Sequence, residues 1–144
     1  MIILDTNIIS EVMRATPDPA VLRWLAAQPL SEFATTTINL AEVRYGLARL
    51  PFGRRRRDLE IKFDSFALRG FANRVLDFDA QAADVYGDLV VAREHAGRRV
   101  EGFDGLISAI AKSRGLPIAT RNTSDFEGFG IAVINPWNAA PPSP

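Results

Sequence analysis

The sequence opens with Met1-Ile2-Ile3-Leu4-Asp5-Thr6-Asn7, and this stretch decides the fold class. Residues 2–4 are all apolar, without the polar alternation of a half-exposed strand, so they predict a strand that is buried on both faces. Asp5, Thr6 and Asn7 are residue types that cap helices. A buried strand that leads directly into a helix is the first unit of an α/β fold, and it places Asp5 at the end of the strand.

Short apolar runs and helical patterns continue to alternate along the chain. Further strands are expected at residues 33–35, 74–77, 116–120 and 131–134, with helices at 17–27, 37–50, 54–70, after Asp79, and from Asp104 to Gly115. Because parallel strands need helical crossovers, this order predicts a three-layer α/β/α sandwich with a mainly parallel central sheet. Residues 1–137 are expected to form one domain, and the proline-rich residues 138–144 a mobile tail.

Composition limits the chemistry that the chain can perform. The 144 residues are 47% hydrophobic, which is enough for one hydrophobic core without disulfides or structural metals. A formal net charge of zero excludes a protein that coats nucleic acid through bulk positive charge. The absence of cysteine excludes disulfides, thiol nucleophiles and cysteine-based zinc sites. With neither a signal-peptide pattern at the start nor a stretch of membrane-spanning length, the protein is expected in the cytoplasm and away from membranes.

Acidic residues follow the predicted strand ends, where ligands of parallel sheets bind. Asp5 follows the first strand, and Asp125 lies in the segment that leaves the strand at 116–120. Asn122, in the same segment, offers a neutral amide oxygen as a ligand. Asp104 begins a helix, and Glu42 emerges from a helix face between Ile38 and Tyr45. Acids gathered at one place repel one another unless a cation holds them, so the pattern favours Mg²⁺ or Mn²⁺ and phosphodiester hydrolysis.

Each of these residues also has a plainer interpretation. Asp5 and Asp104 are both consistent with helix caps, Glu42 with a solvated helix residue, and Asp125 with a turn. Beside the acids, three residues are candidates to orient carboxylates or water, although capping would also explain them: Thr6, Asn7 and Thr120. An arginine run, Arg54-Arg55-Arg56-Arg57, could grip RNA phosphates or could simply form a solvated face.

Four segments together resemble the PIN-domain family. They are Ile-Leu-Asp-Thr-Asn at 3–7, Asn-Leu-Ala-Glu at 39–42, Phe-Asp-Gly-Leu-Ile-Ser-Ala at 103–109 and Ala-Thr-Arg-Asn-Thr-Ser-Asp-Phe at 119–126. Within that family the chain is similar to the VapC toxins of type II toxin–antitoxin systems, particularly the FitB-like branch, which shares the ending Asn135-Pro136-Trp137. The resemblance covers nearly the whole chain.

The resemblance implies a Mg²⁺- or Mn²⁺-dependent endoribonuclease toxin that a VapB-like antitoxin inhibits. It implies a homodimer, a hetero-oligomer with the antitoxin, and operator DNA contacts only through the antitoxin. Asp5, Glu42 and Asp104 match the family's metal-binding acids, whereas Asn122 and Asp125 compete for the fourth position. With the arginine run, Arg121 is a candidate contact for RNA.

Two other functions compete with the ribonuclease. The first is a non-catalytic PIN-like module that binds RNA or a protein, for which the unsettled fourth acid is the motive. The second is a phosphatase or receiver-like domain that uses Asp5 as a phosphoryl acceptor. Metal-dependent RNA turnover would exclude the former, and failure to trap a phosphorylated Asp5 would exclude the latter.

Overall fold

The structure, a computed structural model, describes residues 1–141 apart from the side chain of residue 68; the last three residues of the predicted tail, 142–144, lie outside the described part. Its centre is a five-stranded sheet in the order β3-β2-β1-β4-β5, and every neighbouring pair is parallel. The strands are β1 (Ile2–Leu4), β2 (Phe33–Thr36), β3 (Val75–Leu76), β4 (Ile118–Ala119) and β5 (Val133–Ile134). The expectation of a mainly parallel sheet is confirmed.

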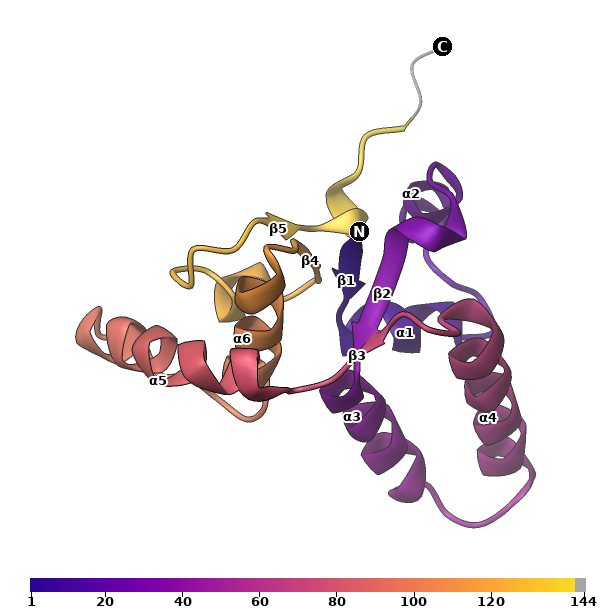
Figure 1. Cartoon of the computed structure of the whole chain (residues 1–144). Helices are drawn as coiled ribbons and strands as arrows, with labels where there is room; N and C mark the ends of the chain where they lie inside the picture. Colours follow the sequence, from indigo (N-terminus) through magenta and orange to yellow (C-terminus); the bar gives the residue numbers. More distant parts are fainter. Residues whose placement is uncertain (142–144) are drawn as a thin grey trace.

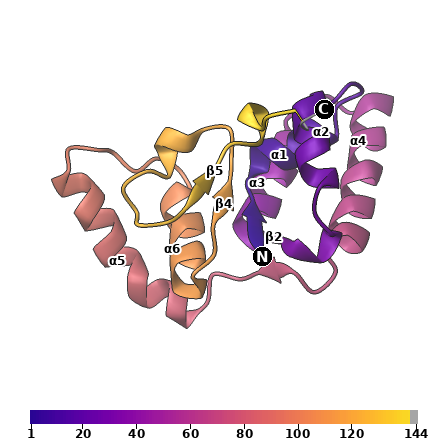
Figure 2. The same ribbon diagram turned by 90° about the horizontal axis from the view of Figure 1, so that it is seen from above.

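Helices connect the strands and cover both faces of the sheet (Figures 1 and 2). They are α1 (Thr6–Val12), α2 (Pro19–Ala26), α3 (Thr37–Ala48), α4 (Arg54–Ser65), α5 (Ala80–His95) and α6 (Asp104–Arg114). Single helical turns occupy Leu30–Glu32, Phe66–Gly70, Thr123–Asp125 and Pro136–Asn138. No helix in residues 1–141 is long and apolar enough to cross a bilayer.

Alternate side chains of β1 enter different cores, as expected of a strand between two helical layers. Ile3 is fully buried among residues of α5, α6 and β4, such as Ala82 and Ile110. Leu4 points to the opposite face, where it packs with Ile8 of α1 and Val21 of α2. The predicted α/β/α sandwich is therefore the observed architecture.

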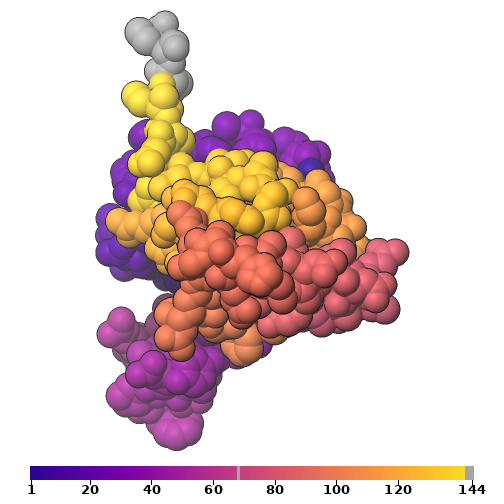
Figure 3. Space-filling view, turned by 90° about the vertical axis from the view of Figure 1, so that its left-hand side faces the viewer, coloured from indigo at the N-terminus to yellow at the C-terminus, as the bar shows by residue number. Residues whose placement is uncertain are grey.

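A third core joins α1 to the pair formed by α3 and α4. It includes Ile9, Val43, Leu47 and Phe63, all nearly inaccessible to solvent. The far ends of α3 and α4, with the turn between them, project from the body of the molecule (Figures 1 and 3). This projection forms one wall of a groove that continues from the candidate site described below.

Several predicted strands are longer than the observed ones. The last two were expected over 116–120 and 131–134, but only Ile118–Ala119 and Val133–Ile134 pair. Just beyond β4, the Thr120 N–H still donates to the Ile134 carbonyl oxygen at 2.8 Å, while the Thr120 hydroxyl donates to Asp5. The predicted strand at 74–77 likewise shortens to Val75–Leu76.

Candidate active site

The sheet order places a topological switch point beside β1. The chain runs from β1 outward to β2 and β3, and then crosses to β4 on the other side of β1. Ligands of parallel sheets bind outside the carboxyl ends of strands at such a point. A pocket of about 570 Å³ opens there, and its lining includes all the acids singled out in the sequence together with Asn122: Asp5, Glu42, Asp104, Asn122 and Asp125.

Asp5 is held by donors from three separate elements. Its Oδ1 accepts hydrogen bonds from the Thr6 backbone N–H at 2.8 Å and from Asn39 Nδ2 at 3.0 Å. Its Oδ2 accepts from Thr120 Oγ1 at 2.7 Å and from Asn7 Nδ2 at 3.3 Å. The residue is only 6% exposed. The capping role foreseen for Asp5 is therefore real, but it accounts for one of four contacts.

Asn39 is a site residue that the sequence did not single out by itself. It is fully buried in the first turn of α3. Its amide donates both to Asp5 and to Thr6 Oγ1 at 3.1 Å, and its Oδ1 accepts from Thr36 Oγ1 at 2.6 Å. Since Thr6 Oγ1 donates onward to Glu42 Oε1 at 2.9 Å, Asn39 connects two of the acids through an unbroken hydrogen-bonded chain.

Thr120 and Asn7 fasten the loop after β4 to the start of α1. The Thr120 hydroxyl donates to Asp5 and accepts from Asn7 Nδ2 at 3.1 Å and from the Asn122 N–H at 3.1 Å, which uses its full capacity. Asn7 Oδ1 accepts from the Arg121 N–H at 3.2 Å. The three residues proposed from sequence to orient the site, Thr6, Asn7 and Thr120, thus all contact Asp5 or its partners.

Burial and neighbouring charge raise the pKa values of three acids in the pocket, Asp5, Glu42 and Asp104. Burial raises the pKa of Asp5, against hydrogen bonds from Thr120, Thr6 and Asn39 that lower it, and the charge of Asp125 raises it further. Burial also raises the pKa of Glu42, with a contribution from the charge of Asp5. For Asp104, burial followed by the charges of Asp125, Asp5 and Glu42 raises the pKa to about 7.

Two of the plainer interpretations do not hold. The residue that caps α6 is Phe103, and Asp104 is the first helical residue, without a side-chain cap bond to the helix. Asp104 is therefore not a capping residue. Glu42 is half-buried and bonded to Thr6, so it is not a solvated helix residue. Asp125 does lie in a helical turn, Thr123–Asp125, and that turn directs it to the same pocket.

A buried arginine supports the turn that carries Asp125. Arg93 of α5 is 6% exposed, and its guanidinium donates to the carbonyl oxygens of Ser124, at 2.9 Å, and Asp125. The same guanidinium lies 4.6 Å from the centre of the Phe129 ring. Its charge is the one influence that lowers the pKa of Asp104. Arg93 was not identified from the sequence.

The arginine run divides into different environments along α4. Arg56 donates to Glu60 at 2.8 Å and to the carbonyl oxygens of Ala48 and Leu50, so it fastens the turn between α3 and α4. Arg54 and Arg55 line a groove of about 1060 Å³ between α1, α3 and α4, which shares Thr6 and Glu42 with the acidic pocket.

Arg57 is exposed on the same helix, whereas Arg121 is exposed in the loop between β4 and the turn Thr123–Asp125. The Arg121 guanidinium is 5.1 Å from the centre of the Trp137 ring, and both residues line the acidic pocket. Of the arginines proposed to contact RNA, Arg121 is therefore the one beside the acids themselves.

The donor set suits a hard divalent cation, which takes carboxylate and amide oxygens. The crowding of like charges in the pocket is the physical reason to expect a cation, because its charge would offset the repulsion that raises these pKa values. Within residues 1–141, however, no three acidic or histidine side chains are gathered closely enough to hold an ion as they stand. The residues fit such a cation by chemistry, and its binding would draw them together.

Asp5, Glu42, Asp104 and Asp125 line one pocket at the C-terminal ends of the strands of a parallel sheet. This arrangement is typical of proteins whose chemistry depends on acidic side chains. The sequence pattern that defines the PIN-domain family matches residues 2–130, so the chain belongs to this family.

Individual relatives are similar over their full length. The chain is 43% identical to VapC ribonuclease Y4jK of Sinorhizobium fredii, covering 97% of this chain and 100% of the relative. It is 37% identical to Toxin FitB of Neisseria gonorrhoeae, covering 96% and 99%. The crystal structure of FitAcB from Neisseria gonorrhoeae superposes with a TM-score of 0.89, at 37% identity over 96% of this chain and 99% of the other. The structure of FitAB bound to the IR36 DNA fragment gives the same TM-score at 36% identity, over 96% of each chain.

Proposed function

We propose that this chain is a metal-dependent endoribonuclease and the toxin of a VapBC-type toxin–antitoxin system. The observation that carries the proposal is that Asp5, Glu42, Asp104 and Asp125 line one pocket, where burial and the charges of the other three raise the pKa of Asp104 to about 7. The chain's similarity to a relative named as a ribonuclease and to another named as a toxin supports the same function.

In this proposal Asp5, Glu42, Asp104 and Asp125 hold Mg²⁺ or Mn²⁺. When bound, the ion supplies Lewis acidity toward a water nucleophile and toward the leaving oxygen of a phosphodiester. Thr6 orients the Glu42 carboxylate by donating to Oε1, which leaves acceptor sites on both oxygens for a cation. Asp5 accepts four hydrogen bonds, of which that from Asn7, at 3.3 Å, is the longest and the least costly to give up.

Asp125 is favoured over Asn122 as the fourth ligand. The charge of Asp125 is the largest electrostatic influence on Asp104 and also raises the pKa of Asp5. Asn122 lines the same pocket but brings no charge to offset that of a cation, and its backbone N–H is already bonded to Thr120. We therefore assign Asn122 a supporting contact, together with Thr6, Asn7 and Thr120.

The partners follow from the relatives. FitAcB and FitAB are two-component assemblies by name, and the latter is bound to DNA. We extend this to a VapB-like antitoxin that inhibits this chain, a homodimer and a toxin–antitoxin hetero-oligomer, with operator DNA reached through the antitoxin. RNA as the substrate places the activity in the cytoplasm. The nuclease domain would comprise residues 1–137.

The decisive experiment uses the full chain, purified away from any antitoxin and treated with a chelator. Internally labelled single-stranded RNA should remain intact until Mg²⁺ or Mn²⁺ is added, and should then be cut at internal positions. Binding of RNA without turnover in either metal would instead establish the non-catalytic alternative. Failure of a phosphoryl analogue to modify Asp5 would exclude phosphoryl acceptance by that residue.

A further inference from the structure

The acidic pocket has two arginines in its lining, Arg14 and Arg121. An RNA strand approaches with the same sign of charge as the acids, so a site that cleaves RNA needs positive side chains beside the acids to offset repulsion of the flanking phosphates. Arg121 was singled out from the sequence, but Arg14 was not. Arg14 lines both the acidic pocket and the groove between α1, α3 and α4, so it stands where the two meet.

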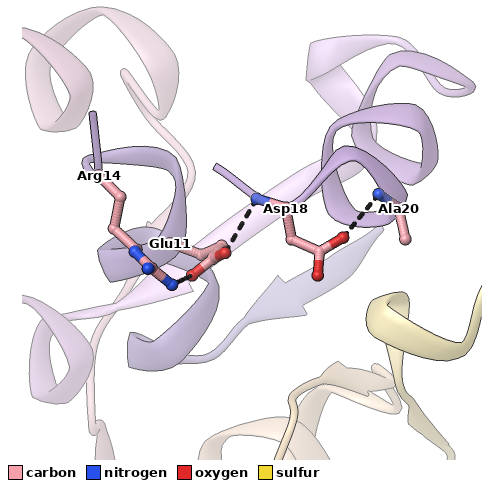
Figure 4. A network of polar contacts seen from close by, with 4 residues as sticks. All are labelled: Glu11, Arg14, Asp18 and Ala20. Atoms are coloured by element: carbon pink, nitrogen blue, oxygen red, sulfur yellow. Dashed lines mark hydrogen bonds and ion pairs between the residues drawn. The ribbon is translucent and has the colours of Figure 1, made fainter. Parts of the chain in front are cut away.

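Arg14 is held in place by a buried carboxylate. Its Nη1 donates to Glu11 Oε2 at 3.2 Å, and the Arg14 side chain is 64% exposed while that of Glu11 is only 7% exposed. Glu11 Oε1 accepts the backbone N–H of Asp18 at 2.9 Å, and Asp18 in turn caps α2 by accepting from the Ala20 N–H at 2.8 Å (Figure 4). The Glu11 carboxylate therefore joins the end of α1 to the start of α2 and holds one nitrogen of the Arg14 guanidinium.

The position of Glu11 does not follow from helix stability. Glu11 lies in the last turn of α1, where the helix dipole disfavours a negative charge, and burial adds a further cost. A neutral glutamine could accept the Asp18 N–H equally well, so that contact does not require a carboxylate. The charge of Glu11 matters for its other partner, the guanidinium of Arg14.

The face of α1 that lines the pocket runs from the acids to Arg14. Thr6, Asn7, Ser10 and Glu11 belong to it, and Arg14 follows two residues after α1 ends at Val12. Glu11, which binds the Arg14 guanidinium, follows Thr6 by five residues, which is about 7.5 Å at the rise of a helix. Arg14 is therefore placed to contact a phosphate that neighbours the one being cleaved, and its guanidinium has donors beyond the one that Glu11 engages.

We propose that Arg14 binds a backbone phosphate of the RNA substrate on the groove side of the acids, and that Glu11 is the positioning residue that orients it. This inference rests on the proposed ribonuclease function. The proposed ligand of Arg14 is a phosphodiester group of single-stranded RNA, one or more nucleotides from the cleaved bond. Arg121, on the Trp137 side, would bind the strand on the other side of the cleaved bond.

The first test compares R14M with R114M as a matched control. Arg114 also forms an ion pair at 3.2 Å, with Asp79, but lies at the end of α6 remote from Asp104. Binding of a short fluorescein-labelled single-stranded RNA is measured in the inactive D5N background at several salt concentrations. R14M should raise Kd roughly fivefold, as expected for one exposed ionic contact. It should also make the slope of log Kd against log salt shallower by about 0.7.

The second test uses E11Q and the double variant R14M/E11Q in the otherwise unaltered chain. E11Q keeps the acceptor for Asp18 and should raise KM for RNA about threefold, with little change in kcat, because one ionic contact is loosened rather than lost. In the R14M background E11Q should have no further effect on KM. An equal effect of E11Q with and without Arg14 would show that Glu11 acts through the fold and would overturn its positioning role.

The proposal for Arg14 fails if R14M and R114M bind RNA alike and share the same salt slope. Weaker binding of a protein partner by R14M, with unchanged RNA affinity, would also overturn it and would assign Arg14 to a protein interface. Cleavage by the unaltered chain is measured alongside, so failure of the ribonuclease function itself is recognised separately. R14K restores the charge without the planar fork and should recover part of the lost affinity.

Discussion

Asp5 and Asp104 face the same pocket but are held in opposite ways. Asp5 accepts hydrogen bonds from Thr6, Asn39, Thr120 and Asn7, and these donors offset much of the cost of its burial. Within the described residues no hydrogen bond reaches the Asp104 carboxylate, and only the charge of Arg93 favours its ionised form. The β1 side of the pocket is thus organised by hydrogen bonds, whereas on the α6 side no described hydrogen bond offsets the burial of Asp104.

The largest loss of RNA cleavage should come from removing the charge of Asp5, on the β1 side of the pocket. Asp5→Asn places an amide among donors and deletes the central carboxylate, so RNA cleavage should fall on the order of 1000-fold. The measurement is the rate of cleavage of labelled RNA with Mg²⁺ or Mn²⁺. Asp18→Asn is the matched control, because asparagine still caps α2. Retention of activity by Asp5→Asn would contradict the central role of Asp5.

The next contrast concerns the α6 side of the pocket and the loop after β4. Asp125→Asn removes the charge that acts most strongly on Asp104, and it should lower cleavage on the order of 100-fold. Asn122→Ala removes only a neutral side chain and should have a far smaller effect. Mn²⁺ affinity measured by calorimetry should follow the same order. The reverse order would assign the fourth ligand to Asn122.

A smaller loss of RNA cleavage is expected when a hydrogen-bond donor to Asp5 is removed and all the acids are kept. Thr120→Val keeps the shape but removes the donor to Asp5 and the acceptor for Asn7 and Asn122. Cleavage should fall about tenfold, and thermal unfolding should report a loss of about 1–3 kcal/mol because buried groups lose partners. Thr123→Val, in the same loop, serves as the control and should leave both quantities nearly unchanged.

The smallest effect is a dependence of stability on pH in the metal-free protein. Asp104 has a pKa of about 7 in the fold and an ordinary value of 3.8, so between these pH values the folded state binds more protons than the unfolded state. The contribution of Asp104 to stability therefore falls as pH rises from about 4 to about 7. The melting temperature should be higher at the acidic end of this window, and Asp104→Asn should flatten the dependence.

Added Mn²⁺ tests whether Asp104 contributes to a metal site. A divalent cation favours the ionised acids, so it should raise the melting temperature more at pH 8 than at pH 5. The shift should be small or absent in Asp104→Asn. A metal-induced shift that is equal at both pH values would show that Asp104 does not contribute to the site.

The sequence predicts the order of the elements and the acids well because both depend on local signals. The apolar run at 2–4 and the helical spacings identify β1 and the helices, and acids just beyond strand ends or at helix starts are visible without a structure. The strand ends were less accurate, as for β4, because pairing with β1 and β5 decides where a strand stops.

The residues that were missed depend on contacts between distant segments. Asn39 meets Asp5 across a separation of 34 residues, and only the pairing of β1 with β2 brings them together. Arg93 reaches the turn at Ser124 across 31 residues. Glu11 has the appearance of an ordinary exposed helix residue until the packing of α1 against α2 buries it. Burial of a charged side chain is the feature that local patterns do not reveal.

The central position of β1 also determines when this protein can become active during its own synthesis. β1 is made first, but its neighbour β4 and the Thr120 donor to Asp5 lie 115 residues later in the chain. Asp125 follows five residues after Thr120. The pocket is therefore completed only after residue 125 has been made, and a polypeptide released before β4 lacks β4, β5 and Asp125. Under the proposed function, a ribosome making this toxin is exposed to its activity only after this last part of the pocket has been made.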